Sequence, residues 1–422
     1  MRLLIPSSND YSLKNMKPTL LFISHVIPIN PSSGQQQRVL QMITEARKIF
    51  EVVFLTYCRN DRIKEVQDQL SVLVDRCIIL PSIYQSSWSR KVWYSILAFL
   101  YQVRNGLKKS NYIIGQLELT RNRVIDALKD EKIDAVIYEY WHAWRSASVF
   151  KDKTIPVILD MHDNLSAAYT GQLAHKQLLP KIIKQRLLEQ YSREEHHAWS
   201  QFNGIIAINK LEMEGVNKIT SNIKLFFCPM GVDLDYWVYS SNPSIPVRFG
   251  FYGGLGSAVN LRQALFTINK IMPLLWQELP DVELWLIGSN PTEELRKIAA
   301  RESRIKVTGF LSDPRPTLAN LTALFCPWEG VFGFRSRVVE VMALGVPVIA
   351  SPDAVAGMGI TTGRGVTLAN SVDKFSENAC QLARNQNYAL KQSREGRSEV
   401  ERKFSTNATY GKLFEEIDNW MK

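Results

Sequence analysis

The 422-residue chain has few cysteines and no long hydrophobic run. Its five cysteines are odd in number, scattered and never spaced as a metal-binding pair, which favours reduced thiols and argues against a zinc site. The opening residues, MRLLIPSSNDYSLKNMKPTLLFIS, contain apolar runs too short for a secretory core, and no segment approaches the roughly 20 apolar residues that span a bilayer. We therefore expect a cytoplasmic protein that does not cross a membrane by itself.

Acidic residues are outnumbered by basic ones. The chain has 51 Lys and Arg against 41 Asp and Glu, a formal net charge of +10 at pH 7. This excess predicts an anionic partner. Nucleic acid is disfavoured as that partner, because the sequence has no recognition motif and no dense basic arm.

One stretch, from Cys77 to Leu117, has no acidic residue at all. Within it, Trp88 and Trp93 lie near the start of the apolar run VWYSILAFLYQV, residues 92–103. The flanking basic residues are Arg90, Lys91, Arg104, Lys108 and Lys109. Residues 88–109 therefore have the pattern of an interfacial amphipathic helix that meets an anionic membrane surface, although a helix buried in the core would show the same apolar run.

Short β-rich runs alternate with helical segments along most of the chain. The expected strands are 19–24, 52–57, 77–80, 135–139, 156–160, 204–208, 249–252, 282–287, 305–308, 323–326 and 346–351. Strands separated by helices form parallel sheets with crossover helices. Because the pattern restarts after the loop SNPSIPVR, we predict two doubly wound α/β domains, 1–240 and 241–403, with a last helix over 404–422 and ligands in the crevice between the domains.

The segment GVFGFRSRVVEVMALGVPVIAS, residues 330–351, has the pattern of a loop, a helix and a strand, with Gly345 ending the helix. A helix N-terminus has unpaired amide donors and a partial positive charge, so this loop predicts a diphosphate site. Arg337 and Glu340 are three residues apart and share one helix face. Arg337 offers a cation for phosphate oxygens and Glu340 a carboxylate for ribose hydroxyls; an exposed ion pair between them is the alternative.

Together these features resemble the group 1 glycosyltransferases, family four of the GT-B fold. The strongest part is IKVTGFLSDPRPTLANLTALFCPWEGVFGFRSRVVEVMALGVPVIAS, similar to the family's G-x-hydrophobic-x-D-x-R segment, its G-x-R-x-(Lys or Arg)-x-x-E helix and its G-x-P-V-hydrophobic end. CPMGVD, residues 228–233, is similar to the family's hinge motif P-N-G-V-D, with Met230 in place of Asn. YGG and Asn260 are similar to the first strand and turn of the nucleotide-binding half.

The N-terminal half carries two further points of resemblance. HVIPINPSSGQQQRVLQM is similar to the family's glycine loop, with Gly34 alone where many members have two glycines. LDMHDN is similar to the D-x-H motif, which places His162 beside the donor sugar. Read without the family, Gly34 is a loop residue before a helix, and His162 fills a strand end while Asp163 or Asn164 caps the next helix.

The resemblance implies a GT-B fold, with two Rossmann-like domains facing each other across a cleft and the C-terminal helix returning to the first domain. It also implies a retaining transfer, without cofactor or metal, from a UDP- or GDP-linked sugar to a glycan or lipid-linked acceptor in surface polysaccharide biosynthesis. Catalytic roles fall to His162, Arg337 and Glu340. Donor-binding roles fall to Gly34, Gly254, Asn260, Arg262, Gly333, Phe334, Arg335, Arg337 and Glu340.

The chain departs from the family eight positions before Glu340, where Phe332 replaces a frequent carboxylate that touches the donor sugar. The transferred sugar is therefore open, and so is the strength of the activity. Two alternatives follow: a sugar-nucleotide epimerase of the same fold, which would need no acceptor, and a non-catalytic protein that binds a nucleotide sugar or a partner glycosyltransferase.

Overall fold

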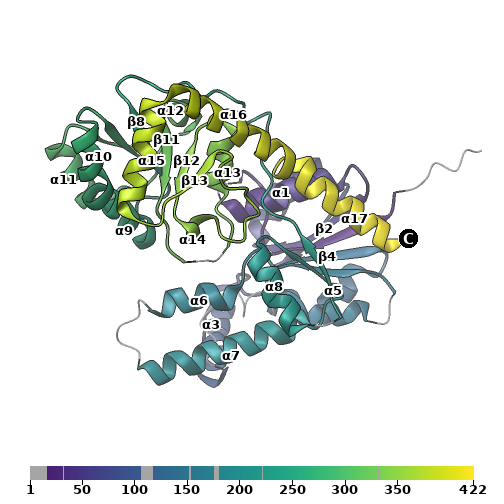
Figure 1. The fold of residues 1–422 in the computed structure, drawn as a ribbon. Helices are drawn as coiled ribbons and strands as arrows, with labels where there is room; N and C mark the ends of the chain where they lie inside the picture. The colour runs from purple at the N-terminus through teal and green to yellow at the C-terminus, as the bar shows by residue number, and fades with distance from the viewer. Residues whose placement is uncertain are drawn as a thin grey trace, which may run out of the picture.

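The computed structural model of the chain describes residues 17–31, 33–105, 117–151, 154–174, 180–220, 222–330 and 333–422. These residues form two parallel β-sheets, each covered by helices (Figure 1). Within the described ranges, the first sheet has seven strands in the order β3-β2-β1-β4-β5-β6-β7, and the second has six in the order β10-β9-β8-β11-β12-β13. The predicted class, two doubly wound α/β units, is confirmed.

The strands of the first sheet are β1 (Thr19–Ile23), β2 (Glu51–Cys58), β3 (Arg76–Pro81), β4 (Ala135–Glu139), β5 (Val157–Asp160), β6 (Gly204–Ala207) and β7 (Lys224–Phe227). Those of the second sheet are β8 (Arg248–Tyr252), β9 (Glu283–Ile287), β10 (Ile305–Gly309), β11 (Ala323–Cys326), β12 (Val348–Ala350) and β13 (Val366–Leu368). The central strands consist mainly of apolar residues, because helices bury both faces of each sheet.

The first unit contains helices α1 (Gly34–Ala46), α2 (Ile63–Leu73), α3 (Trp88–Asn105), α5 (Arg121–Ala127), α6 (Leu165–Ala174), α7 (Lys181–Trp199) and α8 (Lys210–Ile219). The second contains α9 (Ala258–Phe266), α10 (Met272–Glu278), α11 (Glu293–Arg301), α12 (Arg315–Ala319), α13 (Ser336–Ala343), α14 (Pro352–Val355), α15 (Val372–Arg384) and α16 (Gln386–Lys403), followed by α17 (Lys412–Met421). A 3₁₀ segment, Trp141–Phe150, follows β4, and a π-helical turn, Asn407–Gly411, precedes α17.

The predicted strands form within one or two residues of their expected ends, and two further strands, β7 and β13, lie at sheet edges. Edge strands have one neighbour and stay partly exposed, so β7 and β13 lack the long apolar run that marks a central strand. The strand expected over 346–351 begins later, at Val348, because Gly345 has a positive φ of 85° and Pro347 follows it.

Each sheet has its own hydrophobic core. Tyr410, Leu413, Phe414 and Ile417 from the C-terminal segment belong to the core of the first unit. The chain thus runs along the second unit as α16 and returns to the first as α17, the yellow helices in Figure 1. This crossing places both sheets beside one cleft.

For helix α3, the sequence left two interpretations open: an interfacial amphipathic helix and a helix buried in the core. Its apolar side chains are not buried: Trp88 is 81% exposed, Trp93 58% and Phe99 63%. The alternative of a helix packed in the core is therefore wrong for these residues. Among the residues described, no helix combines the length and apolar character that crossing a bilayer requires.

Candidate functional site

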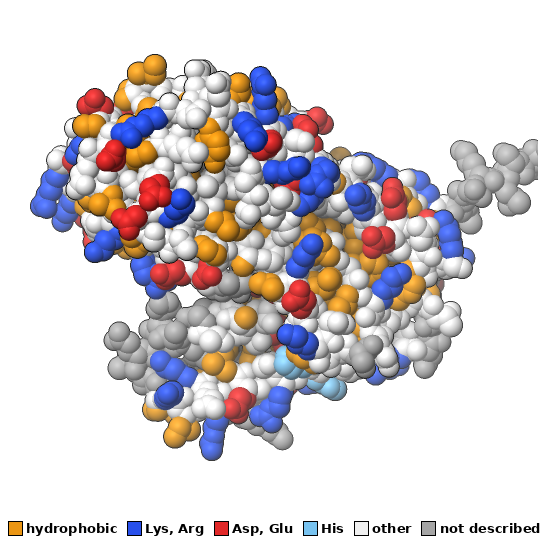
Figure 2. Space-filling model, viewed as in Figure 1, with side chains coloured by type: hydrophobic (Ala, Val, Ile, Leu, Met, Phe, Trp, Pro, Cys, Tyr) orange, Lys and Arg blue, Asp and Glu red, His pale blue; other side chains and the backbone are white. Residues whose placement is uncertain are grey.

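A cleft of about 820 Å³ lies between the two units. Gly34 and Gln37 at the start of α1 line it from the first unit, and Tyr252, Arg337 and Glu340 line it from the second. Figure 2 shows the two units as lobes with a hollow between them. The carboxyl ends of parallel strands open toward such a crevice, so both units present their strand-to-helix loops to it.

The N-terminus of α13 forms the wall of the second unit. Its cap residue, Arg335, gives no side-chain hydrogen bond to the first-turn amides. The first turn of the helix therefore presents amide groups and the positive end of its dipole to the cleft. The guanidinium of Arg337 lies 5.6 Å from the centre of the Tyr252 ring, and no carboxylate of the described residues forms an ion pair with it. Arg337 is thus a cation available to a bound anion.

Glu340 lies one turn after Arg337 and lines the same cleft, but the exposed ion pair considered from the sequence is not formed. Burial raises the pKa of Glu340, against the lowering effects of Ser336 and Arg337. A carboxyl group desolvated in this way is suited to bind hydroxyl donors.

The loop before α13 is shaped by Gly333, whose φ is +67°. This left-handed conformation favours glycine. The amide of Gly333 donates to Oε1 of Glu212 at 2.9 Å, so a residue of the first unit occupies it. Phe334 packs partly against the core of the second unit.

Arg335 is directed toward Gly330 in its own loop and toward helix α14. Its guanidinium donates to the carbonyl oxygens of Gly330, Asp353 and Ala354 at 2.8–3.3 Å. These bonds hold the loop that presents Gly333 and the first turn of α13. The structure therefore gives Arg335 a supporting contact with the loop.

A smaller cavity of about 160 Å³, lined by Tyr252, Gly254, Ser289, Leu311 and Arg337, opens beside the main cleft. It lies where β8, β9 and β10 end, next to a cation, and is bounded largely by backbone and apolar groups. Its size and position suit a planar base whose diphosphate lies at Arg337.

Asn260 and Arg262 lie on α9 behind that cavity. The Asn260 side-chain amide donates to the carbonyl of Gly254 at 3.0 Å and accepts from the Trp328 indole at 3.3 Å. Asn260 thus fixes the turn after β8. Arg262 is exposed and does not line either cavity.

On the first unit, Gly34 is the first residue of α1 and its helix is capped by the hydroxyl of Ser33. A Cβ atom at Gly34 would meet no described atom within 4 Å, so close packing at that position does not require glycine. The absence of a side chain instead leaves the backbone of this helix start open to the cleft.

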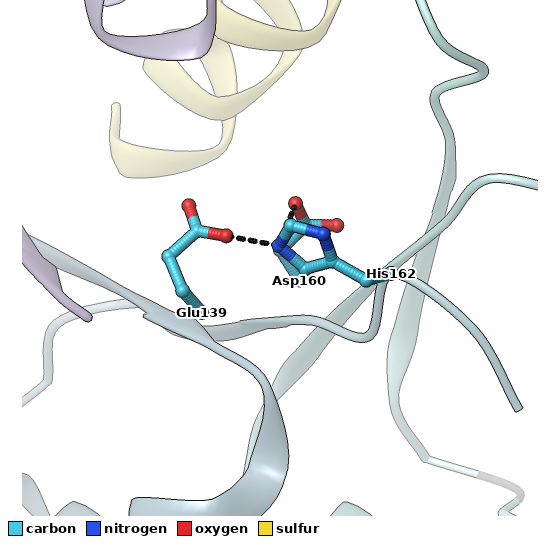
Figure 3. Close-up of side chains that lie close together, drawn as sticks. All are labelled: Glu139, Asp160 and His162. Carbon is cyan, nitrogen blue, oxygen red and sulfur yellow. Dashed lines mark hydrogen bonds and ion pairs between the residues drawn. The ribbon is translucent and has the colours of Figure 1, made fainter. Parts of the chain in front are cut away.

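The ends of β4 and β5 bring together a buried charged cluster of Glu139, Asp160 and His162 (Figure 3). The Nε2 atom of His162 bonds a carboxyl oxygen of Glu139 and lies 3.4 Å from Asp160. From α1, Arg38 donates twice to Asp160, at 2.7 and 2.8 Å, and once to the carbonyl of Cys228. Both oxygens of Asp160 are therefore already taken by a cation.

The two carboxyl groups of this cluster are shifted in opposite directions. Burial alone would raise the pKa of Asp160, but Arg38 holds it below its usual range. Burial and the charge of Asp160 raise the pKa of Glu139. The charge of Arg38 is thus balanced by Asp160.

Oxygen and nitrogen atoms of Glu139, Asp160 and His162 lie within 4.8 Å of one another, a spacing that a metal ion could use. Each carboxyl oxygen of Asp160 already accepts one hydrogen bond from the guanidinium of Arg38.

Aromatic rings surround the cluster. Tyr140 stacks on His162 with ring centres 4.2 Å apart and an interplanar angle of 9°. His162 has a positive φ of 55°, which turns its side chain at the end of β5. His25 and His142 pack on Tyr140, and burial lowers the pKa of His25 to about 4. His162 is thus held on several sides at the edge of the sheet.

The sequence pattern did not identify Arg38, Glu139 or Glu212 as site residues. Glu139 ends a predicted strand that neighbours the strand of Asp160, and strand ends of a parallel sheet meet at one edge. Arg38 stands among buried apolar positions of α1. These two signals would have found the cluster. Of the residues singled out from the sequence, Phe332, Lys108 and Lys109 lie outside the described residues.

Two doubly wound units, a cleft between them and a C-terminal helix that returns to the first unit define the GT-B architecture. Residues 246–385 match the family described as Glycosyl transferases group 1. This domain and the fold support a transferase enzyme.

Solved structures agree on the fold. A glycosyltransferase from Rickettsia africae is 15% identical, with a TM-score of 0.65 over 96% of this chain and 99% of that one. HepE from Anabaena, solved with UDP, is 14% identical, with a TM-score of 0.62 over 96% and 100%. TarM is 10% identical, with a TM-score of 0.62 over 95% and 99%. No curated protein matches the chain.

Proposed function

We propose that the chain is a retaining glycosyltransferase of family four that moves a sugar from a nucleotide diphosphate sugar to a glycan or lipid-linked acceptor in surface polysaccharide or glycoconjugate biosynthesis. The observation that carries this proposal is the first turn of α13, where Arg337 and Glu340 face Gly34 across the cleft. Structures of the same fold give chemical support: HepE has been solved with UDP-glucose, and TarM with UDP and α-GlcNAc-glycerol.

The donor diphosphate lies at Arg337 in this proposal. As the bond to the sugar breaks, negative charge develops on the leaving diphosphate. The guanidinium and the backbone amides that follow Gly333, whose own amide is bonded to Glu212, stabilise that charge without rearranging. Preorganised groups of this kind contribute most to rate. Glu340 accepts from the ribose hydroxyls, and the cavity beside Gly254 takes a uracil or guanine base.

Charge on the donor is balanced by Arg337 and the helix dipole, so the proposed reaction uses no metal ion. The sugar lies toward His162, which contacts it from the strand edge. Retention follows from attack of the acceptor hydroxyl on the face that the diphosphate leaves. No side chain is assigned as a base.

The test is an assay of nucleoside diphosphate release from UDP-, GDP- and ADP-sugars in EDTA, with and without a bacterial lipid and glycan extract. We expect release from one donor class, increased by the extract and undiminished by EDTA. Conversion of the sugar to its epimer without acceptor would identify the epimerase instead. Binding of the nucleotide sugar without release or conversion would identify a non-catalytic protein.

We further propose that α3 places the enzyme on the inner face of the cytoplasmic membrane. Its exposed apolar residues recur on one helix face, and Arg90 and Lys91 flank them. The described residues of α3 include no acidic side chain. An apolar stripe bordered by cations suits an anionic lipid surface.

Co-sedimentation with vesicles of phosphatidylglycerol and phosphatidylcholine tests this placement. We expect binding at low salt that falls when Trp93 and Phe99 are changed to serine. Equal sedimentation with and without anionic lipid, or binding unchanged in the double variant, would contradict it.

A further inference from the structure

One side chain of the first unit, Asn209, bonds two loops of the second unit. Asn209 lies between β6 and α8 and is buried. Its amide nitrogen donates to the carbonyl oxygens of Gly333 and Ala356, each at 2.9 Å. Gly333 precedes α13, and Ala356 follows α14. Asn209 therefore contacts the loop that leads into the first turn of α13, where the proposed diphosphate site lies.

The oxygen of the same side chain has a different partner. Oδ1 of Asn209 accepts from the backbone amide of Leu211 at 2.9 Å and so caps α8. The side-chain amide group of asparagine has two donor hydrogens and an acceptor oxygen, and here both hydrogens and the oxygen are bonded. The cap belongs to the first unit, whereas both donated bonds go to the second. The two purposes of Asn209 can therefore be separated by substitution.

The backbone of Gly333 is bonded on both sides by the first unit. Its carbonyl oxygen accepts from Asn209, and its amide donates to Oε1 of Glu212 at 2.9 Å. With a φ of +67°, Gly333 has a conformation that residues with a side chain rarely adopt. Side chains of the first unit thus hold the turn that directs the chain into α13.

The loop after α14 approaches Asn209 closely. The Lys210 amide donates to the carbonyl of Gly357 at 2.8 Å. A Cβ atom at Gly357 would lie 1.8 Å from Oδ1 of Asn209, and the φ of Gly357 is +71°. Glycine is therefore required at this position for the two units to meet as they do.

The loop before α13 is also bonded within its own unit. Arg335 donates to the carbonyl oxygens of Gly330, Asp353 and Ala354, which ties this loop to α14. Asn209 ties the same two regions to the first unit. Separation of the units would remove the bonds from Asn209 and leave those from Arg335, so the conformation at Gly333 depends on how the units are arranged.

We propose that Asn209 is a positioning residue for the donor diphosphate. It holds Gly333, and with it the backbone amides that follow, in the geometry that receives the diphosphate beside Arg337. Contact between the units is thereby linked to donor binding, and a bound diphosphate in turn favours the contact. This inference rests on the proposed function, because it assumes that a nucleotide diphosphate sugar occupies the cleft.

The experiment measures by calorimetry the affinities for UDP, GDP, CDP and ADP and for the four corresponding monophosphates. Asn209→Ser and Asn209→Asp both keep an oxygen that can cap α8, but both lose the amide donors. Asn385→Ser is the matched control, because Asn385 is exposed and caps α16 with its side chain.

We expect both Asn209 variants to bind the nucleoside diphosphate roughly 5- to 10-fold more weakly than the parent, the usual contribution of a hydrogen bond. Their affinity for the monophosphate should stay within about 2-fold of the parent, because the base and ribose contacts lie elsewhere. The control should match the parent with both ligands. Urea unfolding verifies that each variant is folded, and Asn209→Asp supplies the comparison where Asn209→Ser is not.

Unchanged affinity for the diphosphate in the Asn209 variants would overturn the inference. Equal weakening of diphosphate and monophosphate would also overturn it, since Asn209 would then support the structure in general and not the diphosphate loop. Failure of the parent to bind any of the four diphosphates would overturn the proposed function, and this inference with it.

Discussion

The two walls of the cleft are built from opposite chemistry. The second unit presents a helix start, a glycine loop and the unpaired cation Arg337. The first unit presents the start of α1, with Ser33, Gly34 and Gln37. It also contains a buried cluster in which the cation Arg38 is paired with Asp160. In the proposed function, the wall of the second unit binds the anionic end of the donor, and the wall of the first unit faces its sugar.

This difference explains why both walls are needed for transfer of a sugar. A nucleotide sugar is anionic at one end and rich in hydroxyl groups at the other, so each wall matches one end. The second wall, which the second unit forms, uses backbone groups and first-turn groups of α13 that lie close together in the sequence. The first wall, which the first unit forms, uses side chains from α1, β4, β5 and α8.

The largest expected effect is on the buried pair of the first unit. Arg38→Met leaves Asp160 charged and unpaired, and should lower the free energy of unfolding by about 3–5 kcal/mol. Arg59→Met, which breaks the exposed pair with Asp61, should change it by less than about 1 kcal/mol. Urea unfolding measures both. Equally small changes in the free energy of unfolding for both variants would mean that the hydrogen bonds of Arg38 to Asp160 and Cys228 do not stabilise the first unit.

On the second wall, Arg337→Ala should lower kcat by roughly 10²–10³-fold, about 3–4 kcal/mol, because the cation acts on charge that develops in the transition state. Stability should change little. Arg301→Ala, exposed on α11, is the control. Turnover of Arg337→Ala within a few-fold of the parent would remove Arg337 from the catalytic role.

The units should also differ in the pH dependence of stability. In the first, burial raises the pKa of Glu195 from 4.5 to about 7. The folded state then binds the proton more tightly than the unfolded state, so this contribution is full below pH 4.5 and is lost as the pH rises to about 7. The loss is about 3 kcal/mol. Glu195→Gln should reduce the fall in stability over that range.

In the second unit, burial would raise the pKa of Glu399, but Lys403, Thr361 and Arg402 lower it to about 2. Its contribution is therefore present above pH 4.5 and is lost as the pH falls toward 2. Glu195→Gln should be more stable than the parent above about pH 7. Glu399→Gln should be less stable than the parent above pH 4.5, and the two should converge as the pH falls toward 2. Changes of the same sign in both variants at neutral pH would contradict this contrast.

The smallest expected effect is on α3. Phe99→Ser should change the free energy of unfolding by less than about 0.5 kcal/mol, because the side chain is exposed. Phe251→Ser, in the buried strand β8, should cost several kcal/mol and serves as the contrast. A large loss in Phe99→Ser would show that α3 packs against other parts of the protein.

The second wall could largely be read from the sequence because its parts are contiguous. The loop, the glycine and the helix that carry Arg337 and Glu340 lie within residues 330–351, and helical spacing alone puts both side chains on one face. Arg335 shows the limit of that reasoning. Its type suggested a ligand contact, but its hydrogen bonds go to carbonyl groups of its own loop and of α14.

The first wall could be read only in part, because its contacts join distant positions. Arg38 and Asp160 are 122 residues apart, and Glu212 and Gly333 are 121 apart. His162 was found through its motif, but the spacing of residues gives no sign that Glu139 is its partner. Parallel topology predicts which strand ends meet, and the choice of side chains that bond follows from packing alone.

The central claim is that the α13 wall binds a nucleoside diphosphate. The most direct measurement is thermal unfolding of the parent and of Arg337→Ala with UDP, GDP, CDP and ADP. At a concentration of about 100 times its Kd, a bound nucleotide should stabilise the parent by roughly 2.7 kcal/mol and raise its Tm by a few degrees. The account predicts a shift with one nucleotide in the parent and none in Arg337→Ala. A shift of equal size in both proteins would contradict it.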